Sequence, residues 1–187
     1  TQYPLNVSTS KSLVCIGIFD GAHLGHQALV TAAKRAATKA GLGLTVCTFD
    51  PHPNAVVRPG HAPKLISNLA HRKELLTQIG VDYIEVVSFT PERTNLTPLE
   101  LSRDFLRDRL GAQIVWVGAN FTYGRNGSGD ASTLTENGIE LGFSVKIFDL
   151  VQSDGTISST RIRELVGSGK VHLAAEMLGR NFILSGE

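Results

Sequence analysis

The chain has 187 residues and a mass of 20.1 kDa, a size that fits one ordinary domain with a buried core. Hydrophobic residues make up 42% of it and charged residues 19%, which excludes a disordered or membrane-embedded chain. The formal net charge is +1 and no block of Lys or Arg occurs, so the sequence gives no support for a nucleic-acid-binding surface. A phosphorylated small molecule needs only local positive charge, and that class of ligand stays open.

The cysteines and the N-terminus indicate the compartment. Cys15 and Cys47 each lie in an apolar run typical of a buried strand, which favours two core thiols in a reducing environment. No apolar run reaches the roughly 18 residues of a membrane span, and the first twelve residues lack the apolar region of a signal peptide. We therefore expect a cytoplasmic protein without a membrane partner. Because the chain begins with Thr1, its native start stays open.

Apolar runs alternate with helical patterns from one end of the chain to the other. They predict strands at 13–19, 44–49, 83–87, 114–117 and 145–150, and helices at 25–40, 68–79, 133–141, 160–166 and 171–178. Gly41 and Gly80 follow two of these helices as expected C-terminal caps. Between the second strand and the second helix runs a loop with several prolines, and the glycine-rich YGRNGSGD (123–130) is expected to be mobile.

A further helix is marked at its start by the segment Thr97-Pro98-Leu99-Glu100. Thr97 offers an N-cap, Pro98 fits the first helical position, and Glu100 completes a capping box. Leu101, Phe105 and Leu106 then supply an apolar stripe, and the helix is expected to end at Gly111.

Strands that are apolar throughout, with helices between them, predict a parallel sheet covered on both faces. The fold class is therefore α/β, a doubly wound sheet of about five strands. Such sheets bind ligands beyond the carboxyl ends of their strands, where the strand order reverses.

The stretch GIFDGAHLGH lies where the first predicted strand leads into the first helix. Unpaired N–H groups and the helix dipole make that turn an anion site. Gly17, Gly21 and Gly25 let a ligand approach the main chain, because no side chain stands in the way. His23 and His26 would then donate hydrogen bonds to oxygens that gain charge during a reaction.

Other interpretations of this stretch stay open on spacing alone. The dinucleotide pattern G-x-G-x-x-G and the P-loop pattern are both missing. A zinc site would need further ligands, for which His52 and Cys47 are the only nearby candidates. The histidines could also cap or pack a structural loop.

The same stretch resembles the H-x-G-H signature of nucleotidylyltransferases, in the form typical of bacterial FMN adenylyltransferases (FAD synthetases). Three later stretches match this family in order: FDPHP at 49–53, GANFTYG at 118–124 and ISSTRIR at 157–163. The resemblance runs from the first strand to Gly186 and implies the Rossmann-like nucleotidylyltransferase fold. FDPHP and GANFTYG leave the carboxyl ends of predicted strands, so we expect all four motifs at one edge of the sheet.

The last motif suggests a second phosphate cradle. Ser159 and Thr160 offer hydroxyls at a helix start, and Arg163 lies four residues after Ser159 on the same face. The structural alternative is an N-cap within Ser158-Ser159-Thr160, which is partly true whatever the function. Arg161 projects elsewhere and is expected to be solvated.

The resemblance implies a role for each motif. His23 and His26 would serve the ATP phosphates, with His26 at the α-phosphate, and Ser159, Thr160 and Arg163 would hold the β- and γ-phosphates. The implied catalytic set is His23, His26, Asn120, Ser159, Thr160 and Arg163. Further residues implied at the ATP site are Gly17, Phe19 and Asp20, with Asn120, and those implied to face FMN are His52, Pro53 and Asn120. Mg²⁺ is expected as cofactor, held mainly by substrate phosphates and water because no carboxylate cluster offers a cage.

The implied activity is transfer of AMP from ATP to FMN, which gives FAD and pyrophosphate by in-line attack on the α-phosphorus. The family usually continues into a riboflavin kinase domain. Residues 1–180 are therefore expected to form the adenylyltransferase domain, and residues 181–187 a truncated entry to a kinase domain, so kinase activity is not expected. Thr156 stands where many relatives have Arg or Lys, and Asn120 where many have Asp.

Two other functions stay open. One is a transferase of the same fold that uses another phosphorylated substrate. The other is a binding module for nucleotide or flavin without catalysis, because Thr156 removes one expected phosphate contact.

Overall fold

The computed structural model describes residues 11–91, 95–148, 152–153 and 155–184, with the side chains of 152–156 left aside. Its centre is a sheet of five parallel strands: β1 (Ser12–Ile16), β2 (Gly43–Phe49), β3 (Tyr83–Val87), β4 (Ala112–Gly118) and β7 (Ser144–Phe148). Their order is β3-β2-β1-β4-β7, and Cys15 of β1 lies between Val46 and Trp116 of its neighbours. The doubly wound α/β prediction is confirmed, and the strand order reverses between β1 and β4.

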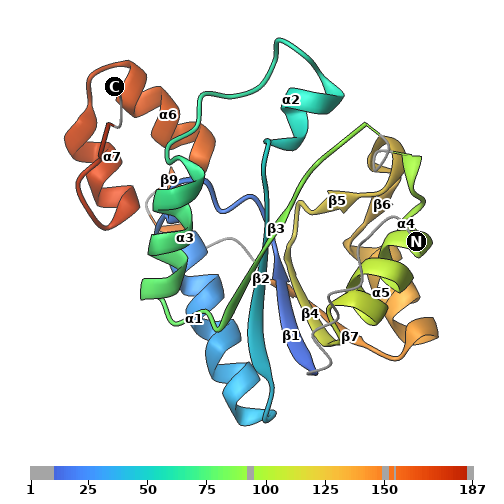
Figure 1. Cartoon of the computed structure of the whole chain (residues 1–187). Helices are drawn as coiled ribbons and strands as arrows, with labels where there is room; N and C mark the ends of the chain where they lie inside the picture. Colours follow the sequence, from blue (N-terminus) through green and yellow to red (C-terminus); the bar gives the residue numbers. More distant parts are fainter. Residues whose placement is uncertain (1–10, 92–94, 149–151, 154, 185–187) are drawn as a thin grey trace.

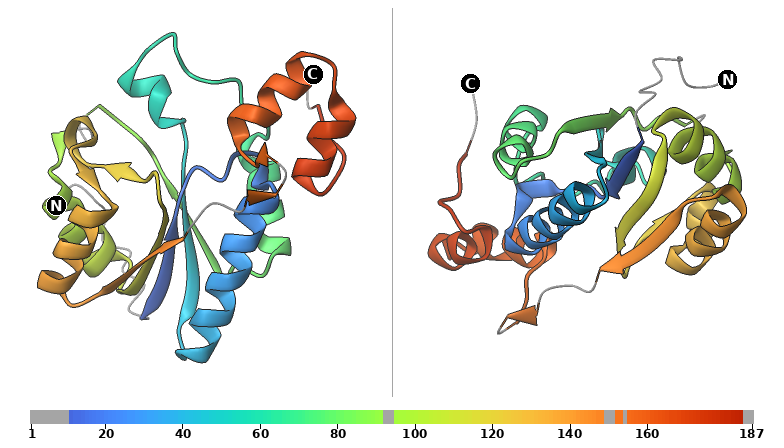
Figure 2. Two further views of the ribbon diagram at one scale, coloured as in Figure 1. Left: turned by 180° about the vertical axis from the view of Figure 1, so that it is seen from behind. Right: turned by 90° about the horizontal axis from the view of Figure 1, so that it is seen from below.

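Helices cover both faces of this sheet (Figures 1 and 2). On one face lie α1 (Leu24–Lys39) and α3 (Leu69–Gln78), and on the other lie α4 (Pro98–Glu100), η3 (Leu101–Arg109) and α5 (Ala131–Leu141). Side chains alternate between the two cores along β1, since Leu13 and Cys15 face α1 while Val14 and Ile16 face η3. The two layers explain why these strands are apolar throughout.

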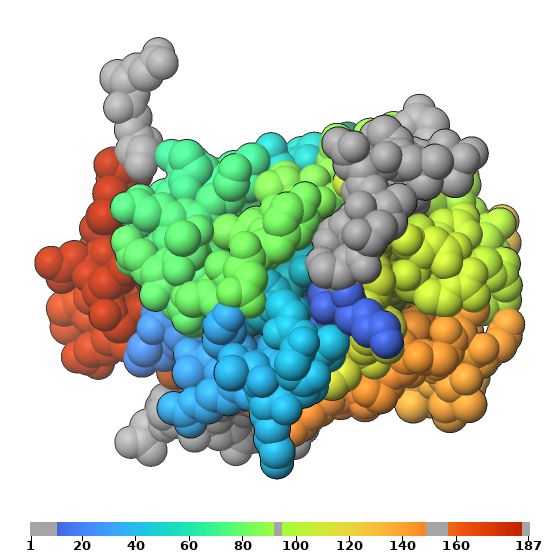
Figure 3. Space-filling view, turned by 60° about the horizontal axis from the view of Figure 1, so that its bottom comes forward, coloured from blue at the N-terminus to red at the C-terminus, as the bar shows by residue number. Residues whose placement is uncertain are grey.

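The last two helices pack beside the sheet and not on it. α6 (Ser159–Gly167) and α7 (Val171–Leu178) form a pair, red in Figure 3, next to α3. Ile66, from the loop before α3, joins their small core of Ile162, Leu165, Ala174 and Leu178. This packing carries the ISSTRIR segment to the loop that follows β1.

Short elements complete the chain. They are η1 (Asp20–Ala22), α2 (Pro53–Val57), β5 (Thr122–Tyr123), η4 (Arg125–Gly127), β6 (Gly129–Asp130), β8 (Gln152–Ser153) and β9 (Gly155–Thr156). The loop with several prolines thus contains a helix, α2, whose N-cap is His52. The stretch 123–130 forms most of a small hairpin in which β5 and β6 pair antiparallel.

The capping box is confirmed. Glu100 N–H donates to Thr97 Oγ1 at 3.2 Å, and Thr97 N–H donates to the Glu100 carboxylate at 2.7 Å. Beyond Glu100 the helix continues as a nine-residue π-helix, η3, which apolar spacing does not distinguish from an α-helix. Gly111, with φ of 59°, follows its end as predicted.

The predicted strand 13–19 is too long. β1 ends at Ile16, and Phe19 has a left-handed φ of 53° that no strand permits. Gly17 N–H donates to Cys47 O at 3.1 Å and Thr48 Oγ1 donates to Ile18 O at 2.8 Å, so β2 guides the chain out of the sheet. The strand predicted at 145–150 is found at Ser144–Phe148, and its last two predicted residues lie outside the described ones.

Both thiols are free and buried in the core, as predicted. Burial raises the pKa of Cys15 and of Cys47, so neither is poised as a nucleophile. Within the described part of the chain, no helix has the length and apolar character needed to cross a membrane.

Candidate active site

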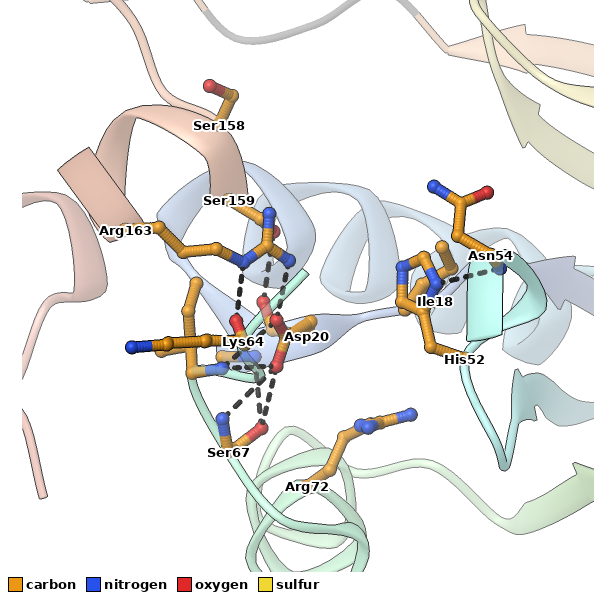
Figure 4. Close-up of polar contacts among 12 residues, drawn as sticks. Ile18, Asp20, His52, Asn54, Lys64, Ser67, Arg72, Ser158, Ser159 and Arg163 are labelled. Carbon is orange, nitrogen blue, oxygen red and sulfur yellow. Dashed lines mark hydrogen bonds and ion pairs between the residues drawn. The ribbon is translucent and has the colours of Figure 1, made fainter. Parts of the chain in front are cut away.

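Asp20, in the loop after β1, is the centre of a buried hydrogen-bond network (Figure 4). Its side chain is 1% exposed and accepts hydrogen bonds from Ile66 N–H at 3.0 Å and Ser67 N–H at 3.1 Å. Arg163 of α6 forms an ion pair with it at 2.7 Å. Asp20 therefore holds two distant segments, the loop before α3 and the start of α6, against η1.

His23 and His26 stack at the start of α1. His23 is the N-cap, and its Nδ1 accepts from His26 N–H at 3.3 Å. The ring centroids lie 3.6 Å apart, and Phe19 meets His26 edge-on with centroids 5.2 Å apart. A Cβ on Gly25 would lie 3.3 Å from the His23 ring, so the glycine permits this close packing. Phe19 itself is buried, and supports His26 from the core.

Both imidazoles are neutral near pH 7. Burial lowers the pKa of His23 to about 4, against the opposing effect of Asp20. Burial, and then the charges of His23 and Arg72, hold the pKa of His26 well below its usual value. His26 Nδ1 is buried without a hydrogen-bond partner among the described residues. A neutral imidazole keeps one N–H, which is the group that a phosphate oxygen can accept from.

The low pKa of His23 predicts that the free energy of unfolding falls in acid. Between about pH 4 and 6.5 the unfolded chain binds a proton at His23 that the folded chain does not, so stability falls as the pH is lowered through that window. The full effect is up to roughly 3 kcal/mol. Denaturant unfolding at several pH values should show this slope. His23→Asn, which keeps an N-cap but cannot titrate, should make it shallower, while His26 and His52, whose pKa burial also lowers, keep a slope of the same sign. An equal slope in this variant would contradict the assignment.

His52 connects the FDPHP turn to the same cluster. It caps α2, with its Nδ1 accepting from Asn54 N–H at 3.1 Å, while Pro53 occupies the first turn. Burial lowers the pKa of His52, and the charge of Arg163 lowers it further while that of Asp20 raises it. His52 thus lies within electrostatic reach of the network around Asp20.

The start of α6 lies against η1, as the two-cradle prediction requires. Ser158 caps the helix by accepting from Arg161 N–H at 3.2 Å, so the N-cap interpretation holds for that serine. Ser159 Oγ donates to Asp20 O at 3.1 Å, and Arg163 Nε donates to Lys64 O at 2.8 Å.

Two further residues in the first turn of α6 are exposed to solvent. Thr160 is exposed in the first turn of the helix. Arg161 is exposed and pairs at 3.6 Å with Glu164, as expected for a solvated residue.

Asn120 stands apart from this cluster. It is exposed and follows β4, which pairs with β1, so it lies at the same edge of the sheet. Its Oδ1 lies 3.3 Å from where a Cβ on Gly118 would be, and in the described ranges no hydrogen bond joins it to the histidines. The structure therefore joins the first and last motifs by direct contact and places FDPHP within reach of their charges. GANFTYG is not joined to them in either way.

The described residues contain no group of three or more His, Cys, Asp or Glu side chains placed to hold one ion. The zinc interpretation with His52 and Cys47 is thus not supported, because four ligands do not converge.

The comparisons with known proteins place this arrangement in a family. Residues 5–161 match the family model described as FAD synthetase. The chain belongs to this family. FAD synthetase membership agrees with the four ordered motifs, which extend across the matched region.

Relatives in this family are similar to nearly the whole of this chain. A bifunctional riboflavin kinase/FMN adenylyltransferase of Bacillus subtilis is 34% identical over 178 residues, covering 95% of this chain and 56% of the relative. One of Escherichia coli K12 is 31% identical over 175 residues, covering 93% and 56%. A solved structure named macrolide-efflux protein, from Streptococcus pneumoniae, has a TM-score of 0.82 at 31% identity and covers 94% of this chain and 66% of that one. The chain spans about half the length of the curated relatives, 56% in both.

Two arginines beside this cluster were missed by sequence reasoning. Arg180 donates to Gly21 O at 2.6 Å, next to the histidines. Arg72 is buried on α3, and it lies three and four residues before the buried Leu75 and Leu76. That helical spacing places Arg72 on the apolar face, and a cation on such a face was the available signal.

Proposed function

We propose that this chain is an FMN adenylyltransferase, which transfers AMP from ATP to FMN and gives FAD and pyrophosphate. One observation carries the proposal: the start of α6 contacts the buried carboxylate of Asp20, whose charge also acts on His52 and on His23 of the stacked histidine pair, at the carboxyl edge of the sheet. This arrangement occurs in a chain of the FAD synthetase family.

The reaction needs no covalent enzyme intermediate. A phosphate oxygen of FMN attacks the α-phosphorus of ATP, and the bond from that phosphorus to the bridging oxygen of pyrophosphate breaks. The protein brings two anions together and stabilises the charge that develops. His26, neutral at working pH, donates its N–H to the α-phosphate, and His23 holds the His26 backbone and ring in place.

The second cradle takes the β- and γ-phosphates in this proposal. Arg163 already gives its Nε to Lys64 O and one terminal nitrogen to Asp20, so its other terminal nitrogen meets a phosphate. The exposed Thr160 adds a hydroxyl at the helix start, where N–H groups also favour anions. Ser159, whose hydroxyl donates to Asp20 O, holds that helix start against η1. Binding would therefore use a guanidinium whose direction is fixed beforehand.

The remaining residues surround these groups. Gly17 and Asp20 shape the loop on which ATP lies, Phe19 supports it from beneath, and Asn120 approaches the nucleotide or flavin phosphate from β4. His52 and Pro53 face FMN. Mg²⁺ is proposed to arrive with the phosphates of ATP and to keep much of its water shell.

The domain boundary near residue 180 is part of the proposal. α7 ends at Leu178, and Gly179 follows with φ of 69°. We assign residues 1–180 to adenylyl transfer and 181–187 to the entry of a riboflavin kinase domain. The names of the longer relatives support this division. A cytoplasmic location is proposed from the two free, buried thiols.

The test is direct. The chain is incubated with FMN, ATP and Mg²⁺, and FAD and pyrophosphate are measured by chromatography and a coupled assay; we expect both to form in equal amounts. Phosphopantetheine and nicotinamide mononucleotide serve as competing acceptors. Faster transfer to either would favour another transferase of this fold, and no FAD over a wide range of Mg²⁺ would favour a binding module.

A further inference from the structure

Arg72 of α3 is the largest of the fully buried side chains, with 1% of its surface exposed. One terminal nitrogen donates to Thr48 Oγ1 and to Phe49 O, each at 3.0 Å, at the carboxyl end of β2. Its Nε is buried and has no hydrogen-bond partner among the described residues. The proposed mechanism above does not use this group.

The positive charge of Arg72 has no paired anion. In the described part of the chain, no carboxylate oxygen lies within 4.0 Å of its guanidinium. Asp20 is engaged by Arg163, and both Asp20 and Asp50 act on Arg72 only from farther away. Burying a cation without a partner is costly, so such an arrangement calls for an explanation.

The position of Arg72 provides an explanation for this unpaired charge. Arg72 lies beneath the site, on the side towards His52 in Figure 4, and it is bonded to Phe49, the first residue of FDPHP. Its charge lowers the pKa of His26 and of His52, so it lies within reach of both. These two histidines mark the proposed places of the α-phosphate and of FMN, and the flavin phosphate must lie between them.

A purely structural role for Arg72 explains fewer of these observations. The bonds to Thr48 and Phe49 fasten α3 to the end of β2, but a neutral donor such as glutamine could make them without burying a charge. The unpartnered Nε and the missing anion stay unexplained by that role. Both are explained if the anion is the substrate.

We propose that Arg72 is a substrate-binding residue whose fixed positive charge, from beneath the site, holds the phosphate of the flavin substrate. The inference rests on the proposed adenylyl transfer to FMN. In a poorly screened interior a buried charge attracts an anion even without direct contact. Riboflavin, which lacks the phosphate, gains nothing from this charge.

Arg72→Met tests the proposal because it removes the charge and keeps an unbranched buried chain that reaches about as far as the arginine Nε. We expect the Kd for FMN to rise roughly 10–100-fold and the Kd for riboflavin to change less than about twofold. Both are measured by flavin fluorescence with the full chain, and KM for FMN should rise more than kcat falls. Lys73→Met is the matched control, since it removes the same charge from an exposed position of α3 and should leave both values unchanged.

Every other outcome counts against either the proposed function or the role given to Arg72. If the unmodified chain makes no FAD, the proposed function fails; if it makes FAD and Arg72→Met binds FMN normally, only the role of Arg72 fails. Weaker ATP binding with unchanged FMN binding would assign the charge to the nucleotide and overturn the proposal. If Arg72→Met does not fold, Arg72→Gln decides, because glutamine removes the charge and keeps a donor for Thr48 and Phe49. It should still weaken the binding of FMN relative to riboflavin, and an unchanged ratio overturns the proposal.

Discussion

Replacing His26 by alanine is expected to lower kcat for FAD formation by roughly 10²–10³-fold, or about 2.7–4 kcal/mol, as for the loss of one transition-state donor. The imidazole is neutral because burial holds its pKa low, so its N–H is available to the α-phosphate at any working pH. Its contribution grows as charge develops on the phosphate oxygens. Steady-state rates at saturating ATP and FMN measure the effect.

The binding of FMN, measured by calorimetry, should change little in this variant. His61→Ala is the control, since His61 is exposed on the loop between α2 and α3 and is expected to leave kcat unaltered. Alanine also removes the ring that stacks on His23. The thermal unfolding temperature of the variant therefore shows how much of the lost activity comes from a weaker fold. Normal turnover of His26→Ala at saturating ATP would remove His26 from the mechanism.

Replacing Asp20 by alanine is expected to lower the free energy of unfolding by about 3–5 kcal/mol. The change leaves the N–H groups of Ile66 and Ser67 without an acceptor, and leaves the guanidinium of Arg163 without its ion-pair partner. Denaturant unfolding, with the slope on denaturant checked for constancy, measures the loss.

Asp108→Ala is the matched control, because Asp108 pairs with Arg107 in solvent, where both side chains are at least 40% exposed. Such a pair contributes about 0–1 kcal/mol. The double variant with Arg163→Ala should recover part of the loss, since no unpaired cation is left behind. Equal losses in Asp20→Ala and Asp108→Ala would refute the central place given to Asp20.

Much of the fold could be predicted because it depends on local chemistry. The capping box at Thr97 and Glu100 uses contacts within one helical turn, and the alternation along β1 follows from a sheet covered on both faces. The placement of the motifs after β1, β2 and β4 was also predictable, since parallel strands end at one edge. The packing of α6 and α7 beside the sheet adds the last motif, through the contact of Arg163 with Asp20.

What escaped prediction depends on contacts between distant segments. Phe19 turns out of the strand because β2 holds the backbone beside it, and Asp20 binds residues 46 and 47 positions away. No pattern around Asp20 reports those partners. The π-helix η3 was likewise not predictable, because its apolar spacing fits an ordinary helix. The roles given to Asn120 and Thr160 stay predictions for the binding experiments.

The hydrogen bond from Arg180 to Gly21 O links the chain after α7 directly to the loop that precedes His23. Gln27 adds a second tie, since its amide spans Ala22 O and Leu178 O at 2.9 and 3.0 Å. Tension applied to the backbone beyond Leu178 therefore reaches the loop at Gly21 before it reaches any strand. A tether attached there, in a pulling instrument or on a surface, would therefore strain the loop at Gly21 and Ala22 first.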